Sequence, residues 1–344
     1  MMKTNDFPGV EVPPEIVDDF TRRKFLIGVG LITFAPACGS GGESSGGTNS
    51  SGGTRTIEHK FGSAEVPENV ERVVAVGFNE ADFALALGVV PVGVRDFIGP
   101  YPEETRPWAQ DALESGEEPE LVGGEEINFE AVAALEPDVI LGIYSFMTQE
   151  NYDLLAEIAP TVAQPAEYED GGTPWQEQMH ITGRALGMEA RAEEVVAEVE
   201  GRFDEARESH PDFEGKTAAI TLIFEEEFYV LESTDLRTLL FTSLGFEMPE
   251  ETGPVSRERV DLLDRDALVF VGADREDLAD DELIQSLEAA EEGRVVYFGD
   301  LTTDFAGALG YSSPLSLPFA LEEAVPRLAA AVDGDPETKV ESAS

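Results

Sequence analysis

The chain has 344 residues, 42% of them hydrophobic, so it is long and apolar enough for two domains and is not a disordered acidic protein. Its formal net charge is −49, and the acidic residues are spread along the whole chain. With only 22 Lys and Arg residues, it has no basic stripe that could neutralise phosphates, which excludes nucleic acid as a partner.

The basic residues comprise 5 Lys and 17 Arg. A carboxylate-rich, lysine-poor surface is typical of proteins that work in high salt, where screening relieves self-repulsion. We therefore expect an acidic, halophilic surface.

The N-terminus is predicted to be a signal followed by an anchor. Arg22 and Arg23 form a twin-arginine pattern, and the apolar run after them, about 13 residues, fits a signal rather than a membrane span. Small residues precede Cys38, as in a lipoprotein signal, although Ala35 stands where that pattern usually has Leu. Residues 1–37 are the predicted signal. A lipid on Cys38 would then hold the protein at the outer face of the cytoplasmic membrane.

A flexible Gly/Ser-rich tether is predicted over residues 38–56, followed by a first lobe over residues 57–172. In that lobe, alternation of apolar runs with helical patterns indicates a parallel α/β sheet. The expected strands are 72–77, 89–95, 138–143 and 161–164, and the expected helices are 79–88, capped by Asn79, and 149–158.

Two helices are expected to connect the lobes over residues 173–210. The first begins near Thr173-Pro174 and breaks near Gly187. The second runs from Glu189 to Ser209 and carries an apolar stripe that includes Val195, Val199 and Phe203. At about 1.5 Å per residue it is long enough to bridge two small domains.

The second lobe is predicted over residues 211–333, and a disordered tail over residues 334–344. The expected strands are 217–224, 228–231, 267–272 and 295–298, and the expected helices are 234–244, 281–290 and 314–332.

An eleven-residue pattern occurs twice, at residues 128–138 and 256–266, with a constant offset of 128. Glu130 in the first copy matches Glu258 in the second. Each acid follows a small polar residue expected to cap a short helix, and each copy precedes an apolar strand. The helix dipole alone favours an acid in a first turn, but two matched copies indicate two similar lobes.

The order and spacing of these segments resembles the iron–siderophore branch of the class III substrate-binding proteins of ABC importers, the family that binds ferric enterobactin, ferrichrome or iron dicitrate. The resemblance covers about residues 57–330. The segments that carry it are residues 128–138, 172–178, 185–187, 239–246 and 255–260.

The resemblance implies an α/β fold of two Rossmann-like lobes joined by a long rigid α-helix, the class III periplasmic-binding-protein fold. It implies a monomeric binding protein, not an enzyme, that holds a ferric siderophore between its lobes and delivers it to an ABC permease dimer. Glu130 and Glu258 would each form a salt bridge with arginines of one permease subunit. No cofactor or metal ligand is implied, because the iron arrives inside its chelate.

Ligands of open α/β sheets bind beyond the carboxyl ends of the strands. Aromatic residues and arginines in these positions suit a large, partly apolar and often anionic chelate. Arg95 and Arg237 are the expected anion contacts. The full set of predicted ligand-binding residues is Phe78, Arg95, Trp108, Tyr144, Trp175, Phe224, Tyr229 and Arg237.

Four alternatives stay open. Cobalamin or haem could replace the siderophore in the same fold. A free-metal binder is disfavoured, because the chain has only three His and no Cys beyond Cys38. A nucleotide-dependent enzyme is disfavoured because Gly28-Val29-Gly30 lies in the signal and no phosphate-binding loop follows a strand. A tethered adhesion module would lack a pocket between the lobes.

Overall fold

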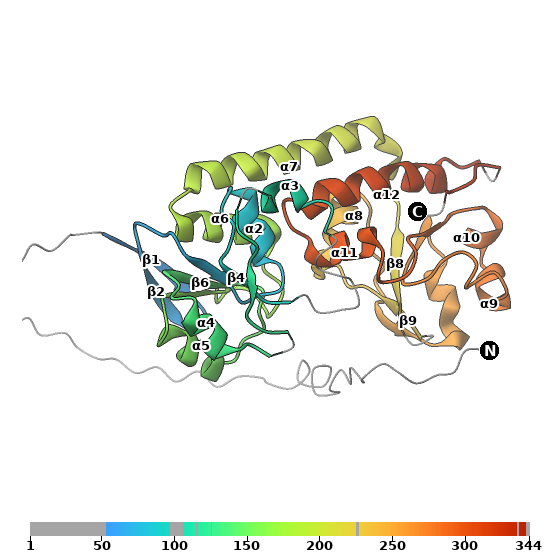
Figure 1. Ribbon diagram of the computed structural model, residues 1–344. Helices are drawn as coiled ribbons and strands as arrows, with labels where there is room; N and C mark the ends of the chain where they lie inside the picture. The colour runs from blue at the N-terminus through green and yellow to red at the C-terminus, as the bar shows by residue number, and fades with distance from the viewer. Residues whose placement is uncertain are drawn as a thin grey trace, which may run out of the picture. The chain divides into compact units, whose positions relative to one another are not determined.

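The computed structural model describes residues 53–341 except 97–105, 115, 125, 225, 226 and 336. Cys38, Arg22 and Arg23 lie outside these residues. The described residues belong to one compact unit, residues 51–344, which contains two five-stranded sheets (Figure 1). The α/β prediction is confirmed.

The first lobe is built on a parallel sheet with strand order β5-β4-β3-β6-β7. Its central strands are apolar and buried on both faces, as parallel strands covered by helices require. The strands are β3 (Val73–Ala75), β4 (Gly93–Val94), β5 (Glu120–Leu121), β6 (Val139–Gly142) and β7 (Thr161–Ala163). The helices are α2 (Glu80–Ala86), α3 (Gln110–Leu113), α4 (Phe129–Ala134) and α5 (Gln149–Ala156).

An antiparallel hairpin precedes this sheet and was missed by the sequence analysis. It consists of β1 (Thr54–His59) and β2 (Gly62–Pro67), so the predicted tether ends too late by three residues. The hairpin alternates exposed and buried positions and packs Ile57, Ala64 and Val66 against the lobe. Thr54 directly follows the Gly/Ser-rich segment, so the composition of that segment gave no indication that β1 begins there.

The second lobe has a mixed sheet with order β10-β9-β8-β11-β12, in which β9 and β10 are antiparallel. The short β8–β9 connection can join only antiparallel neighbours, which explains the direction of β9. The strands are β8 (Ala218–Phe224), β9 (Glu227–Val230), β10 (Gly253–Val255), β11 (Ala267–Val271) and β12 (Val295–Tyr297).

The helices of the second lobe are shorter and more divided than predicted. The segment 234–244 splits into η4 (Leu236–Thr238) and α8 (Leu239–Ser243), and 281–290 splits into α9 (Glu282–Gln285) and α10 (Glu288–Glu291). The remaining helices are η3 (Pro211–Phe213), η5 (Arg257–Leu263), α11 (Asp304–Tyr311), which was not predicted, and α12 (Ser316–Val332).

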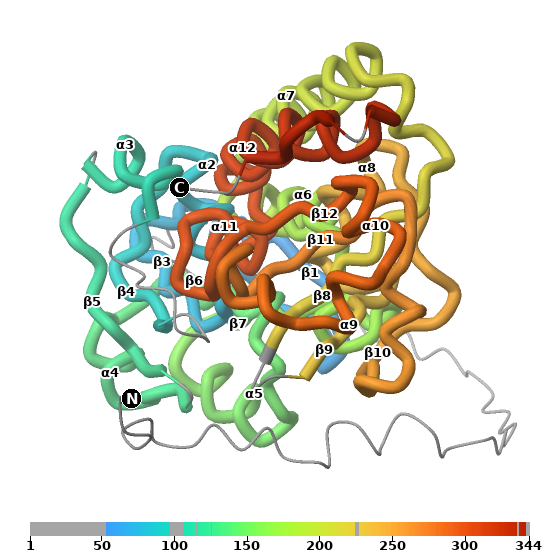
Figure 2. The backbone as a smooth tube through the Cα atoms, turned by 90° about the vertical axis from the view of Figure 1, so that its right-hand side faces the viewer, coloured from blue at the N-terminus to red at the C-terminus, as the bar shows by residue number. Residues whose placement is uncertain are grey.

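The connecting helices are α6 (Trp175–Leu186) and α7 (Glu189–Ser209), and the predicted bounds of α7 are confirmed. Gly187 adopts a left-handed conformation (φ 69°) that ends α6, so the chain can turn into α7. α7 packs on α6 and on α12, and Figures 1 and 2 both place α7 and α12 side by side.

The largest apolar core crosses from one lobe to the other. It joins Phe83 and Leu87 of the first lobe to the buried stripe of α7 and to residues of β8, β11, α11 and α12. Val340, in the tail predicted to be disordered, is also part of this core and is 6% exposed. Its carbonyl accepts a hydrogen bond from Arg275 (3.1 Å), so this part of the prediction is wrong.

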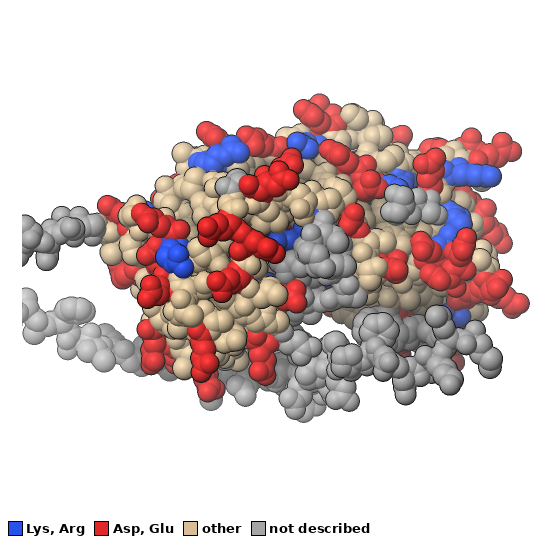
Figure 3. Space-filling model, in the orientation of Figure 1, with Lys and Arg blue, Asp and Glu red and all other residues tan. Residues whose placement is uncertain are grey.

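The charge pattern agrees with the composition. Figure 3 shows carboxylates scattered over the visible face, with few Lys and Arg among them. Many of the ion pairs among the described residues join exposed partners, such as Arg191 with Glu194 and Glu198 on α7. Each such exposed ion pair contributes little to the stability of the fold.

Candidate functional site between the lobes

The two copies of the sequence repeat occupy equivalent places in the two lobes. Glu130 lies in the first turn of α4 and Glu258 in the first turn of η5, and both are exposed. Each helix leads into the strand next to the central one, β6 or β11. The acids at the ends of the repeats also match, because Asp138 accepts hydrogen bonds from the backbone that enters β3, and Asp266 from the backbone that enters β8.

The helix starts differ between the copies. Asn128 accepts a hydrogen bond from the Ala131 amide (3.1 Å) and caps α4 as expected. Ser256 makes no side-chain cap, and η5 is a 3₁₀ helix with a kink at Arg259. The expected second cap is therefore wrong, although the exposed acid is retained.

An aromatic cluster with a buried arginine lies at the carboxyl ends of three neighbouring strands of the first lobe. Phe78 follows β3, Arg95 follows β4, and Tyr144 and Phe146 follow β6. Because the strands are parallel, their ends meet at one edge of the sheet. The Arg95 guanidinium stacks 4.1 Å from the Phe78 ring centroid, and the Tyr144 and Phe146 rings are 5.2 Å apart.

Phe146 was missed as a site residue. It is 49% exposed and has a left-handed backbone (φ 52°), which is rare for a bulky residue. Its ring centroid is 6.2 Å from that of Phe78. The sequence signal was its place two residues after Tyr144, at the same strand end.

Arg95 is held by backbone carbonyls of the first lobe. Its Nε donates to the carbonyl of Gly124 (2.6 Å), and its Nη1 to those of Val76 and Ser145 (3.4 Å each). Burial lowers the pKa of Arg95, and the negative charge of Glu80 opposes that change. The guanidinium thus links three loops at the strand ends.

Glu80 is a buried acid beneath this cluster that the sequence analysis did not single out. It is fully buried, and its carboxylate accepts hydrogen bonds from the amides of Asn79 (3.3 Å) and Tyr144. Burial raises the pKa of Glu80 to about 7, against the opposing effect of these backbone donors. A Cβ at Gly77 would overlap the Glu80 carboxylate, so glycine is needed there.

The second lobe contributes Arg237, which is near Tyr144 of the first lobe. Arg237 binds Asp235 through both Nε (2.8 Å) and Nη2 (2.6 Å). Burial raises the pKa of Tyr144 to about 12, and the positive charge of Arg237 opposes that rise. Burial also pushes up the pKa of Asp235, but the bonds from Arg237 bring it below its usual value. Tyr229, in β9, is 40% exposed.

The remaining predicted ligand-binding residues are Trp175, Trp108 and Phe224. Trp175 is 2% exposed and lies in the core that crosses the lobes, so it presents no surface to a ligand, and that prediction is corrected. Its sequence position at a helix start did not reveal which face it occupies. Trp108 is partly buried and donates its Nε1–H to Asp82 (2.8 Å). The backbone of Phe224 pairs with Glu227 at the end of β8, and its side chain is outside the described atoms.

Two hollows lie elsewhere on the protein. One, with a volume of about 430 Å³, is lined by α7 and the turn between α11 and α12, and the other, about 560 Å³, lies next to β10 and α8. Neither is lined by Phe78, Arg95 or Tyr144. The candidate site therefore rests on the convergence of side chains at the strand ends and not on the size of a cavity.

The described residues contain no group of three or more His, Cys, Asp or Glu arranged to hold a metal ion. Within the same ranges, none of the helices has the length and apolar composition needed to span a bilayer.

Two lobes, each built on a five-stranded sheet and joined by the helices α6 and α7, with an aromatic and charged cluster at the strand ends of the first, define a two-lobed solute-binding protein. The chain belongs to the periplasmic binding protein family, whose model matches residues 73–301. Members of this family are substrate-binding proteins of transporters rather than enzymes.

Similar proteins fit this assignment. The probable siderophore-binding lipoprotein YfiY of Bacillus subtilis (strain 168) is 30% identical over 241 residues, which is 69% of this chain and 70% of YfiY. A periplasmic solute-binding protein of Mycobacterium smegmatis superposes with a TM-score of 0.73 at 31% identity, over 81% of this chain and 99% of the other. PiaA of Streptococcus pneumoniae TIGR4, solved in complex with ferrichrome, has a TM-score of 0.69 at 29% identity over the same shares.

Proposed function

We propose that this protein captures a ferric siderophore between its lobes and delivers it to an ABC permease. The observation that carries the proposal is the cluster of Phe78, Arg95, Tyr144 and Phe146, with Arg237 of the second lobe near Tyr144, in a chain related to YfiY and PiaA. Such a ligand brings its iron fully coordinated, so the protein needs to supply packing and hydrogen bonds and no metal ligands.

Ligand binding can be tested by fluorescence, because Trp108 and Trp175 are the only tryptophans. Ferric ferrichrome, a ferric tris-catecholate, cyanocobalamin and haem would be titrated into the full chain and into the Phe78→Ala variant. We expect saturable quenching by a ferric siderophore and weaker binding by Phe78→Ala. Binding of cobalamin or haem alone would identify a different cargo, and binding of none would refute uptake.

Docking on a dimeric permease is assigned to Glu130 and Glu258. Each is exposed, and each belongs to the equivalent segment of its lobe, so a two-fold symmetric partner could bind one acid per subunit. An exposed ion pair contributes only about 0–1 kcal/mol, which suits a transient and salt-sensitive contact.

The docking assignment predicts that the double variant Glu130→Arg/Glu258→Arg abolishes uptake and leaves siderophore affinity unchanged. A matched control is Glu150→Arg/Glu282→Arg, which reverses one exposed first-turn acid in each lobe. Uptake of radiolabelled ferric siderophore by cells carrying each variant is the measurement. Normal uptake by the first variant, or equal loss by the control, would show that the two acids are not docking points.

The location proposed is the outer face of the cytoplasmic membrane, reached through the twin-arginine signal at Arg22 and Arg23 and kept by a lipid on Cys38. The protein would act there as a monomer. Loss of membrane association in Cys38→Ser, measured by fractionation, tests the anchor.

A high-salt habitat is proposed from the net charge of −49 and the low lysine content. Salt would stabilise the compact state by screening repulsion between carboxylates. A melting temperature that stays the same from low to molar salt would contradict this.

A further inference from the structure

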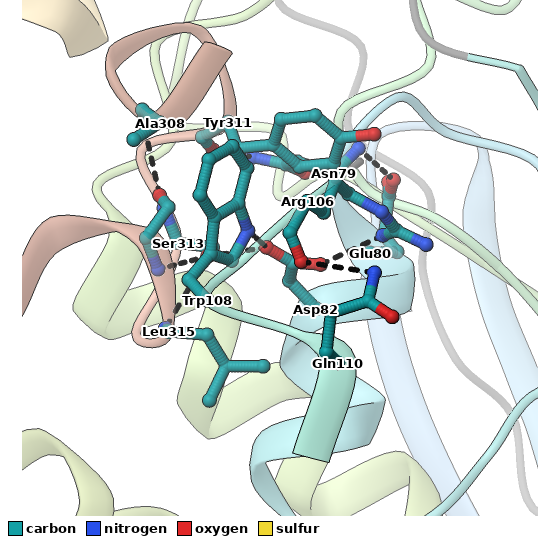
Figure 4. Close-up of polar contacts among 11 residues, drawn as sticks. Asn79, Glu80, Asp82, Arg106, Trp108, Gln110, Ala308, Tyr311, Ser313 and Leu315 are labelled. Carbon is teal, nitrogen blue, oxygen red and sulfur yellow. Dashed lines mark hydrogen bonds and ion pairs between the residues drawn. The ribbon is translucent and has the colours of Figure 1, made fainter. Parts of the chain in front are cut away.

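The aspartate Asp82 lies at a buried contact between the lobes that the proposed function does not use. Its side chain is fully buried on α2. Its Oδ1 accepts a hydrogen bond from Arg106 Nη1 (2.9 Å), and its Oδ2 accepts from Trp108 Nε1 (2.8 Å) and from Ser313 Oγ (2.7 Å) (Figure 4). Three donors therefore meet on one buried carboxylate.

The donors come from both lobes. Arg106 and Trp108 belong to the first lobe, whereas Ser313 lies in the turn between α11 and α12 of the second. A second hydrogen bond runs in parallel, from Asn79 Nδ2 to the carbonyl of Tyr311 (3.0 Å). Asn79 was expected to cap α2, and the structure instead shows it making this contact between the lobes, with no cap.

Aromatic side chains cover this contact. The Trp108 ring packs against Tyr311 and Phe319, with centroids 5.6 Å apart in each case. The Arg106 guanidinium lies 5.4 Å from the centroid of the Tyr311 ring. Tyr311 of α11 and Phe319 of α12 thus pack on Trp108 of the first lobe, and together they shield the carboxylate from water.

A buried charge is costly unless all its hydrogen bonds are made, so a movement of the lobes that breaks these bonds is unfavourable. If the second lobe rotated away from α2, the Asp82 carboxylate would lose Ser313, and the Tyr311 carbonyl would lose Asn79. Burial raises the pKa of Asp82, and Arg106, Ser313 and Trp108 oppose that change by stabilising the ionised form. The closed contact is therefore favoured over partly open ones.

We propose that Asp82 is a positioning residue that locks the two lobes in one relative orientation, through Ser313 on one side and Arg106 and Trp108 on the other. This buried hydrogen-bond centre then connects the lobes in addition to the helices α6 and α7 and the apolar core that crosses between them. By fixing the lobes, the centre sets the separation of Glu130 and Glu258. This role of Asp82 does not depend on which ligand the protein binds.

The alternative is that apolar packing alone fixes the lobes, since the largest core also crosses between them. Two variants separate these explanations. Ser313→Ala removes the hydroxyl that donates to Asp82 and accepts from the amides of Leu315 and Ser316, and it leaves Arg106 and Trp108 in place. Asp82→Asn keeps the size of the side chain and removes its charge.

Glu80 offers a matched control on the same helix. It is as buried as Asp82 and lies two positions before it, but it accepts hydrogen bonds from Asn79 and Tyr144, which both belong to the first lobe. Glu80→Gln should therefore disturb the first lobe without loosening the contact between the lobes.

The measurement is the distance between spin labels by pulsed electron resonance. Labels would be placed on Glu157→Cys in the first lobe and Glu288→Cys in the second, both exposed, in the full chain with its only cysteine removed by Cys38→Ser. We expect a narrow distance distribution for the parent and for Glu80→Gln. Ser313→Ala and Asp82→Asn should broaden or shift it, Asp82→Asn more strongly.

An unchanged distribution in Ser313→Ala and in Asp82→Asn would overturn the proposal, because apolar packing would then suffice. Equal broadening by Glu80→Gln would also overturn it, since the effect would not depend on bonds between the lobes. If Asp82→Asn does not fold, Ser313→Ala decides the question alone, because it keeps the charge of Asp82 and its bonds from Arg106 and Trp108.

Discussion

Replacement of Glu80 by Gln should change how stability depends on pH. The carboxyl is fully buried, and its pKa is raised from 4.5 to about 7 in the folded protein. A raised folded pKa means that the folded state binds the proton more tightly than the unfolded state does. The associated stability is fully present below pH 4.5 and is lost as the pH rises towards 7.

The size of the effect follows from that interval. Each unit of difference between the folded and unfolded pKa of Glu80 corresponds to about 1.4 kcal/mol. Between pH 4.5 and 7 the free energy of unfolding of the parent should therefore fall by about 3 kcal/mol relative to that of Glu80→Gln. Gln keeps an oxygen that can accept from the Asn79 and Tyr144 amides but carries no charge. Repulsion among the many surface carboxylates changes equally in both proteins and cancels in the difference.

The assay is urea unfolding of both proteins at pH 5, 6, 7 and 8 in the same high salt. We expect the advantage of Glu80→Gln over the parent to be smallest at pH 5, to grow up to pH 7 and to change little between pH 7 and pH 8. Glu150→Gln, which alters an exposed acid, should follow the parent throughout. A difference between parent and Glu80→Gln that does not vary with pH would refute the reasoning about Glu80.

Two further predictions concern packing. Trp175→Ala should cost about 3–5 kcal/mol of unfolding free energy, because the indole is buried in the core that crosses the lobes, and a melting temperature close to that of the parent would place Trp175 outside that core. Removal of residues 337–344 should lower the free energy of unfolding by about 2 kcal/mol, because it deletes the buried Val340. Removal of residues 342–344 keeps Val340 and is the control. Equal melting curves for the two truncations would contradict the packing of Val340.

Local patterns in the sequence predicted much of the fold. Continuous apolar runs indicated the central strands, because a parallel strand covered on both faces has no polar side. The bounds of α7 were correct because a helix of that length shows its apolar stripe over many turns. Glycines and prolines then fixed where it begins and ends, as Gly187 and Pro211 do.

The same patterns failed where segments were short. Thr54 to His59 form a strand only because they pair with Gly62 to Pro67, and the neighbouring Gly and Ser gave a tether instead. The division of residues 281–290 into two short helices depends on Asp264, which accepts from the amides of Glu288 and Ala289. A bond between residues this far apart leaves no periodic signal in the sequence.

The sequence by itself determined that there are two lobes, since the repeated segments placed Glu130 and Glu258 at equivalent helix starts, and it placed Arg95 and Tyr144 at strand ends. Only the tertiary structure decided that Trp175 is core, that Glu80 is a buried acid beneath the site, and that Asp82 joins the lobes. The physical reason is that burial and charge pairing depend on the three-dimensional neighbours of a side chain. Asp82 and Ser313 are 231 residues apart in the chain and share one hydrogen bond.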